Sequence, residues 1–139
     1  MRKTKMRKRM TVFIMMMSVF AAAYAHEGHD KPDVLPPVGP HGGKYTKMVH
    51  HFAEVVVTGD MAMIYILEDD IKSAPEKLSD VKASLETPGK GTTSLKLSGT
   101  EGAFHANISI PKNVRRVYFH ISAKVDGKLE SGKVLYEPK

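Results

Sequence analysis

The sequence contains no cysteine, and this absence excludes several kinds of site. The chain has neither disulfides nor thiolate metal ligands, and it cannot carry a lipid-modified amino-terminal cysteine. Catalytic signatures are also absent: there is no Gly-x-Ser-x-Gly elbow, no phosphate-binding glycine loop, no His-Glu-x-x-His zinc motif and no cysteine nucleophile. We therefore expect that the protein is not an enzyme and that burial of apolar side chains alone stabilises it.

The sequence also lacks an apolar run of the roughly 20 residues needed to cross a bilayer. A shorter apolar run, residues 11–23, follows a basic segment and precedes the small-x-small sequence Ala23-Tyr24-Ala25. These three parts in this order are typical of a secretory signal peptide. The sequence predicts a signal peptide over residues 1–25 and cleavage before His26. The exported product is expected to be soluble, with no stable membrane insertion.

Cleavage changes how the composition is interpreted. Six of the 21 basic residues and six of the nine methionines lie in the predicted signal peptide, whereas all seven histidines follow it. The remaining chain carries 15 basic and 15 acidic residues and is close to neutral. Its charge therefore gives no indication of nucleic-acid binding. Histidine is the enriched residue of the mature chain.

The mature chain divides into a short arm and one domain. Residues 26–40 contain four prolines, which disfavour helices and central strands, so they predict a flexible arm. Residues 41–139 contain short β-branched and aromatic runs without helical periodicity. They predict an all-β, immunoglobulin-like antiparallel sandwich of about seven or eight short strands. The expected strands are 45–49, 51–58, 61–68, 81–87, 92–97, 103–110, 116–125 and 128–136.

Turn chemistry supports this prediction. Gly59-Asp60 and Asp126-Gly127 each separate two apolar runs, which is typical of hairpin turns between antiparallel strands. Residues 98–102 are rich in glycine and small polar residues and predict a further reversal. The longest gap between expected strands, residues 69–80, predicts a crossover between the two sheets.

The new amino terminus is the first candidate metal site. After cleavage, the α-amine and the imidazole of His26 can chelate one ion, and copper(II) favours nitrogen-rich sites of this kind. The α-amine has a pKa of about 7.7 to 8.0, so protons compete only modestly near neutrality. His29 could add a further ligand. The alternative is a polar tail that binds metal weakly and incidentally.

His41, His50 and His51 form a second candidate site at the entry to the domain. Adjacent residues on a strand face opposite sides, so we expect only one of His50 and His51 to pair with His41. The alternative is an exposed histidine pair at a strand end. His105 and His120 fit half-buried packing positions. Met61 and Met63 share one strand face, which suits a copper(I) thioether pair but suits a core stripe better.

Three segments resemble a known family: residues 40–44 (PHGGK), residues 52–57 (FAEVVV), and residues 64–70 (IYILEDD) with Lys72 and Pro75. They are similar to the small periplasmic His-Gly-Gly domains associated with heavy-metal efflux systems. The resemblance implies a periplasmic β-sandwich concerned with copper, silver, zinc, cobalt or nickel, with a metal-efflux component as partner. It also makes His41 the best-supported ligand.

These observations together predict a periplasmic transition-metal-binding accessory protein. It would capture or buffer a metal ion, with copper favoured over zinc, cobalt, nickel and silver. The expected ligands are His26, His29, His41, His50 and His51. The alternative function is an immunoglobulin-like interaction or scaffold module of the cell envelope, in which metal binding is incidental.

Overall fold

Nine strands and no helix make up the part of the chain described by the computed structural model, residues 35–139. The predicted signal peptide and residues 26–34 of the predicted arm lie outside the described residues. The strands are β1 (Lys44–Lys47), β2 (Phe52–Thr58), β3 (Met61–Leu67), β4 (Leu78–Thr87), β5 (Gly91–Ser94), β6 (Ser98–Thr100), β7 (Ala103–Asn107), β8 (Val117–Val125) and β9 (Lys128–Tyr136). Within residues 35–139 there is no helix that could span a membrane.

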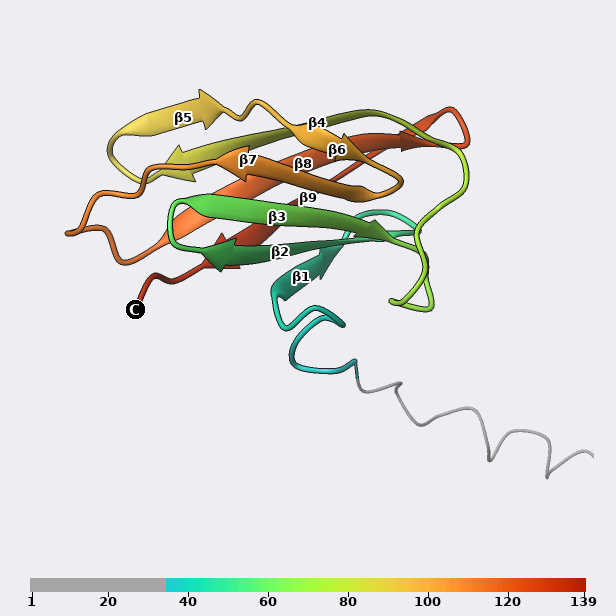
Figure 1. Ribbon diagram of the computed structural model, residues 1–139, viewed down its shortest axis with the longest axis horizontal. Coiled ribbons are helices and arrows are strands. Elements are labelled where there is room, and N and C mark those ends of the chain that lie inside the picture. The colour runs from blue at the N-terminus through green and yellow to red at the C-terminus, as the bar shows by residue number, and fades with distance from the viewer. Residues whose placement is uncertain (1–34) are drawn as a thin grey trace, which may run out of the picture. The chain divides into compact units, whose positions relative to one another are not determined.

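The strands form two antiparallel sheets that face each other as in a sandwich (Figure 1). The five-stranded sheet has the order β1-β2-β3-β7-β6, and the four-stranded sheet has the order β5-β4-β8-β9. The predicted all-β antiparallel sandwich is confirmed. The strand number differs, because β6 forms within the segment that sequence predicts only as a reversal. It pairs with β7 through a hairpin at Glu101 and Gly102, both with positive φ angles.

Both predicted hairpins are confirmed. Thr58 pairs with Met61, and Gly59 between them has a positive φ. Val125 pairs with Lys128, and both residues of the Asp126-Gly127 turn have positive φ angles, as a type I′ turn requires. The predicted crossover is also confirmed, since β3 and β4 belong to different sheets.

The core lies between the sheets and follows the two-residue alternation of their strands. In β3, for example, Ala62, Ile64 and Ile66 point into the core, whereas Met61, Met63 and Tyr65 occupy the outer face. Phe119 is the largest fully buried side chain. The cluster also contains Ala53, Val55, Ala83, Leu85, Ile108, Val117, Ile121, Ala123 and Val134.

Residues 36–40 of the predicted arm belong to the same compact unit as the strands. The amide of Gly39 donates a hydrogen bond to the carbonyl of Gly43 (2.9 Å), and the Tyr45 hydroxyl donates one to the carbonyl of Pro36 (2.5 Å). These bonds fold the segment onto the outer face of the five-stranded sheet, because Tyr45 pairs there with Glu54. The segment therefore helps to build the site that contains His41.

Candidate metal centre

Glu54 is a fully buried carboxylate on the outer face of the five-stranded sheet. Its Oε1 accepts hydrogen bonds from the amides of His41 (2.9 Å) and Gly43 (3.0 Å), and its Oε2 lies 2.7 Å from Nδ1 of His41. A buried carboxylate is tolerated only when donors replace its lost water. Here one turn, residues 39–43, supplies all of these donors.

Glycine is required at two positions of this turn. A Cβ on Gly43 would overlap the carbonyl oxygen of Val55, and a Cβ on Gly39 would overlap the carboxyl group of Glu54. Gly42 is different, because it has open space around it and a positive φ of 84°. The His-Gly-Gly sequence therefore allows the turn to bend and to approach β2 closely enough to bond Glu54.

The His41 ring is held by two contacts and still reaches the surface. It stacks on the ring of Tyr65, with 3.6 Å between ring centroids and 4° between planes, while Nδ1 contacts Glu54. Its side chain is 40% exposed, in contrast to 0% for Glu54. A histidine that donates one ring N–H to a carboxylate has its tautomer and orientation fixed, and the other nitrogen can bind a metal. Because Nδ1 contacts Glu54, Nε2 is the ring nitrogen that could bind a metal.

Glu130 forms a second centre of similar construction. Its Oε1 accepts hydrogen bonds from three consecutive amides, those of Val49 (2.9 Å), His50 (2.6 Å) and His51 (3.1 Å). Its Oε2 lies 2.5 Å from Nδ1 of His51. Glu130 pairs with the core residue Ala123, so it lies on the inner face of the four-stranded sheet. The turn between β1 and β2 thus closes one end of the sandwich.

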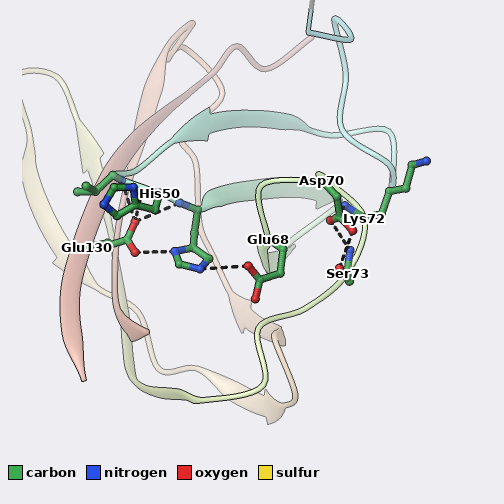
Figure 2. A network of polar contacts seen from close by, with 8 residues as sticks. His50, Glu68, Asp70, Lys72, Ser73 and Glu130 are labelled. Atoms are coloured by element: carbon green, nitrogen blue, oxygen red, sulfur yellow. Dashed lines mark hydrogen bonds and ion pairs between the residues drawn. The ribbon is translucent and has the colours of Figure 1, made fainter. Parts of the chain in front are cut away.

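The two ring nitrogens of His51 both contact carboxylates. Nε2 lies 3.3 Å from Glu68 and Nδ1 contacts Glu130, so these two glutamates, both labelled in Figure 2, flank the ring. The His51 side chain is only 13% exposed. Because its two nitrogens are engaged and its ring is largely buried, His51 ties β9 to the end of β3.

Hydrogen bonding shifts the pKa of Glu130 strongly. Burial alone would raise it, but the hydrogen bonds from His50, His51 and Val49 stabilise the ionised form and lower the pKa to about 2. Nearby, Asp70 fixes the loop that follows Glu68 by accepting hydrogen bonds from the amides of Lys72 and Ser73 (Figure 2). The bond from the Ser73 amide is the main reason that the pKa of Asp70 is lowered.

The structure separates the histidines that sequence analysis groups together. His41 contacts Glu54, whereas His51 contacts Glu130 and Glu68. His50 is exposed and takes part through its backbone amide. Both His50 and His51 precede β2 and lie in a turn, so the expectation based on strand alternation does not apply to them. His26 and His29 lie outside the described residues.

The remaining candidate residues occupy the outer faces of the sheets. His105 is exposed, and Nε2 of half-buried His120 lies 2.5 Å from Glu86. The core interpretation of Met61 and Met63 is wrong: Met61 is 40% exposed, and neither residue belongs to a core cluster. Sequence correctly places them on one strand face, but the core lies on the other face of β3.

Sequence analysis misses Glu54, Glu68 and Glu130 as partners of the histidines. For Glu54 a signal exists, because it is the only acidic residue in the apolar run of residues 52–57. An acidic residue in a strand with two buried faces needs donors from elsewhere. Glu130 has no comparable signal, since it does not lie within an apolar run: Lys128 and Leu129 precede it and Ser131 and Gly132 follow it.

Within residues 35–139, no group of three or more His, Cys, Asp or Glu side chains is placed to hold a metal ion. Comparisons with known proteins found no match to this chain among family models, curated proteins or solved structures.

Proposed function

We propose that the protein is an exported, periplasmic accessory protein that captures or buffers a transition-metal ion for a heavy-metal efflux system. The resemblance of its His-Gly-Gly segment to the efflux-associated domains motivates the biological setting. The physical argument rests on one side chain, His41.

The geometry of His41 carries the proposal. Its Nδ1 is 2.7 Å from a fully buried carboxylate, its ring is stacked on Tyr65, and its side chain is 40% exposed. A carboxylate at the other nitrogen makes an imidazole a better metal ligand and reduces the entropy lost when it binds. Ordinary surface histidines have neither a fixed ring nor a buried partner.

The predicted mature amino terminus would supply a separate group of ligands, namely its α-amine, His26 and His29. These residues lie outside the part of the chain that the structure describes.

Metal titration tests this proposal against a matched control. Copper(II) and zinc(II) are titrated into exported protein, after mass spectrometry has verified that it begins at His26. The variant His41→Ala is compared with His120→Ala. His120 is a suitable control, because its side chain is also 40% exposed and also contacts a glutamate, but that glutamate, Glu86, is 34% exposed.

We expect His41→Ala to weaken metal binding by about tenfold or more. Removing only the carboxylate that orients a histidine ligand typically costs about tenfold or more, and this variant removes the ligand itself. His120→Ala should leave affinity unchanged. Equal losses in both variants would contradict the role of His41. Wild-type binding no tighter than that of a generic histidine peptide would contradict the proposal and favour the interaction-module alternative.

A further inference from the structure

The outer face of the five-stranded sheet exposes two methionines side by side. Met61 and Met63 alternate along β3 with Ala62 and Ile64, which are fully buried in the core. Met61 is 40% exposed and Met63 is half-buried. Successive residues on one strand face are about 6.7 Å apart, so the two thioethers can approach one point through their flexible side chains.

A histidine faces the same point from the neighbouring strand. His105 on β7 is in register with Met63 on β3, and it is exposed. Residues directly opposite each other on antiparallel strands have Cβ atoms about 5 Å apart, and diagonal neighbours are about 7 to 8 Å apart. His105 therefore lies within side-chain reach of both Met63, its direct partner, and Met61, its diagonal neighbour.

The direct cross-strand partners of this trio carry no carboxylate. The row that crosses the sheet through Met63 contains Val56 on β2 and Ser98 on β6, and the partner of Met61 is Asn107. Protein sites for magnesium and calcium are built largely on carboxylates, which these direct partners do not supply. Thioether and imidazole ligands without anionic oxygen favour soft cations such as copper(I).

We propose that Met61, Met63 and His105 form a three-ligand site for a soft monovalent cation, copper(I) or silver(I). The backbone of two hydrogen-bonded strands fixes the three Cβ positions, so binding orders only the ends of the side chains. The site uses none of the ligands assigned to the His41 centre. It extends the proposed metal-binding function to a different ion, and each of the two proposals can fail alone.

Methyl NMR of the methionines tests the site directly. Exported protein with ¹³C-labelled methionine methyl groups is titrated with silver nitrate in chloride-free buffer. The predicted mature chain contains only three methionines, and the third, Met48, packs against the core. We expect one equivalent of silver(I) to shift the Met61 and Met63 resonances while that of Met48 stays in place. Equal responses from all three methyl groups, or none, would overturn the proposal.

Substitutions provide a second measurement. Met61→Leu combined with Met63→Leu keeps the size and apolar character of this surface and should weaken silver(I) binding by at least about tenfold, as should His105→Gln. Met48→Leu is the control for losing a methionine, and His120→Ala is the control for losing a histidine on the other sheet. Both should bind silver(I) like the wild type, and the double leucine variant should keep its copper(II) affinity. Unchanged silver(I) affinity in the double variant would refute the site.

Discussion

Two buried glutamates, Glu54 and Glu130, are held by the same kinds of donor but leave their histidines in different surroundings. Each accepts hydrogen bonds from backbone amides and from Nδ1 of a histidine. The His41 ring lies on Tyr65 at the surface and is 40% exposed, whereas His51 is 13% exposed and also contacts Glu68. A buried glutamate in contact with a histidine therefore does not by itself indicate a metal site, because the histidine ring must also be accessible.

The positions of the two glutamates explain the difference. Glu54 is on the outer face, where a single glycine-containing turn covers it and leaves the ring of His41 above the sheet. Glu130 is on the inner face, where its partners come from the other sheet. The second arrangement fastens the two sheets together, and the first presents a ring nitrogen outward.

Removing each glutamate should reveal unequal contributions to stability. Glu130→Ala leaves three amides and a largely buried ring without an acceptor, and we expect it to lower the free energy of unfolding by about 3 to 5 kcal/mol. Glu54→Ala leaves two amides, and its histidine can turn to water, so we expect about 2 to 4 kcal/mol. Urea denaturation followed by far-UV circular dichroism measures both, with exposed-pair variant Glu86→Ala as the control. A loss for Glu54→Ala larger than that for Glu130→Ala would contradict this comparison.

Acid should weaken the Glu130 centre in a defined range of pH. The pKa of Glu130 is lowered from 4.5 to about 2, so the unfolded chain binds its proton more readily than the folded protein does. The contribution is fully present above pH 4.5 and is lost as the pH falls through about 2. Its full size is about 3 kcal/mol, and urea midpoints between pH 5 and 2 measure it. Glu130→Gln should flatten this dependence, and Glu86→Gln should not. If the urea midpoint of Glu130→Gln depended on pH as steeply as that of the wild type, another titrating group would be responsible.

The two glycines of the motif should respond differently to a methyl group. Gly43→Ala places a Cβ against the carbonyl oxygen of Val55, and we expect a loss of about 1 to 3 kcal/mol together with weaker metal binding, because His41 is displaced. Gly42→Ala meets open space and should cost about 1 kcal/mol, which comes from its positive φ. Urea denaturation and copper(II) titration of both variants check this order. If Gly42→Ala destabilised the protein more than Gly43→Ala, the close approach of the turn to β2 would not explain the requirement for glycine at position 43.

Metal affinity should depend on only one of the two glutamates. Glu54→Gln leaves an acceptor for the turn but removes the charge behind His41, and we expect copper(II) affinity to fall by about 10- to 100-fold. Glu130→Gln should change copper(II) affinity little, since His51 already contacts Glu68. Calorimetric titration of both variants at a pH near neutrality measures the difference. Equal effects would mean that the two centres do not differ in function.

The hairpins, the crossover and the all-β class could be predicted because they depend on short stretches of sequence. Asp126-Gly127 adopts the positive φ angles that its residue types favour. The sequence does not predict β6, because its three residues are of the types that favour turns. They form a strand because they pair with β7. The prediction that Met61 and Met63 lie in the core is wrong, because the alternation of residues along a strand does not show which of its two faces is buried.

Short stretches of sequence set the alternation of strands and turns, because each depends on neighbouring residues. The contact between a given histidine and a given carboxylate instead depends on the tertiary structure. Glu54 reaches His41 across 13 residues, and Glu130 reaches the turn at His51 across 79 residues. Such partners meet only after the strands have paired and the sheets have packed. The resemblance of the His-Gly-Gly segment predicts His41 as a ligand, and only the structure shows that a buried glutamate contacts its ring.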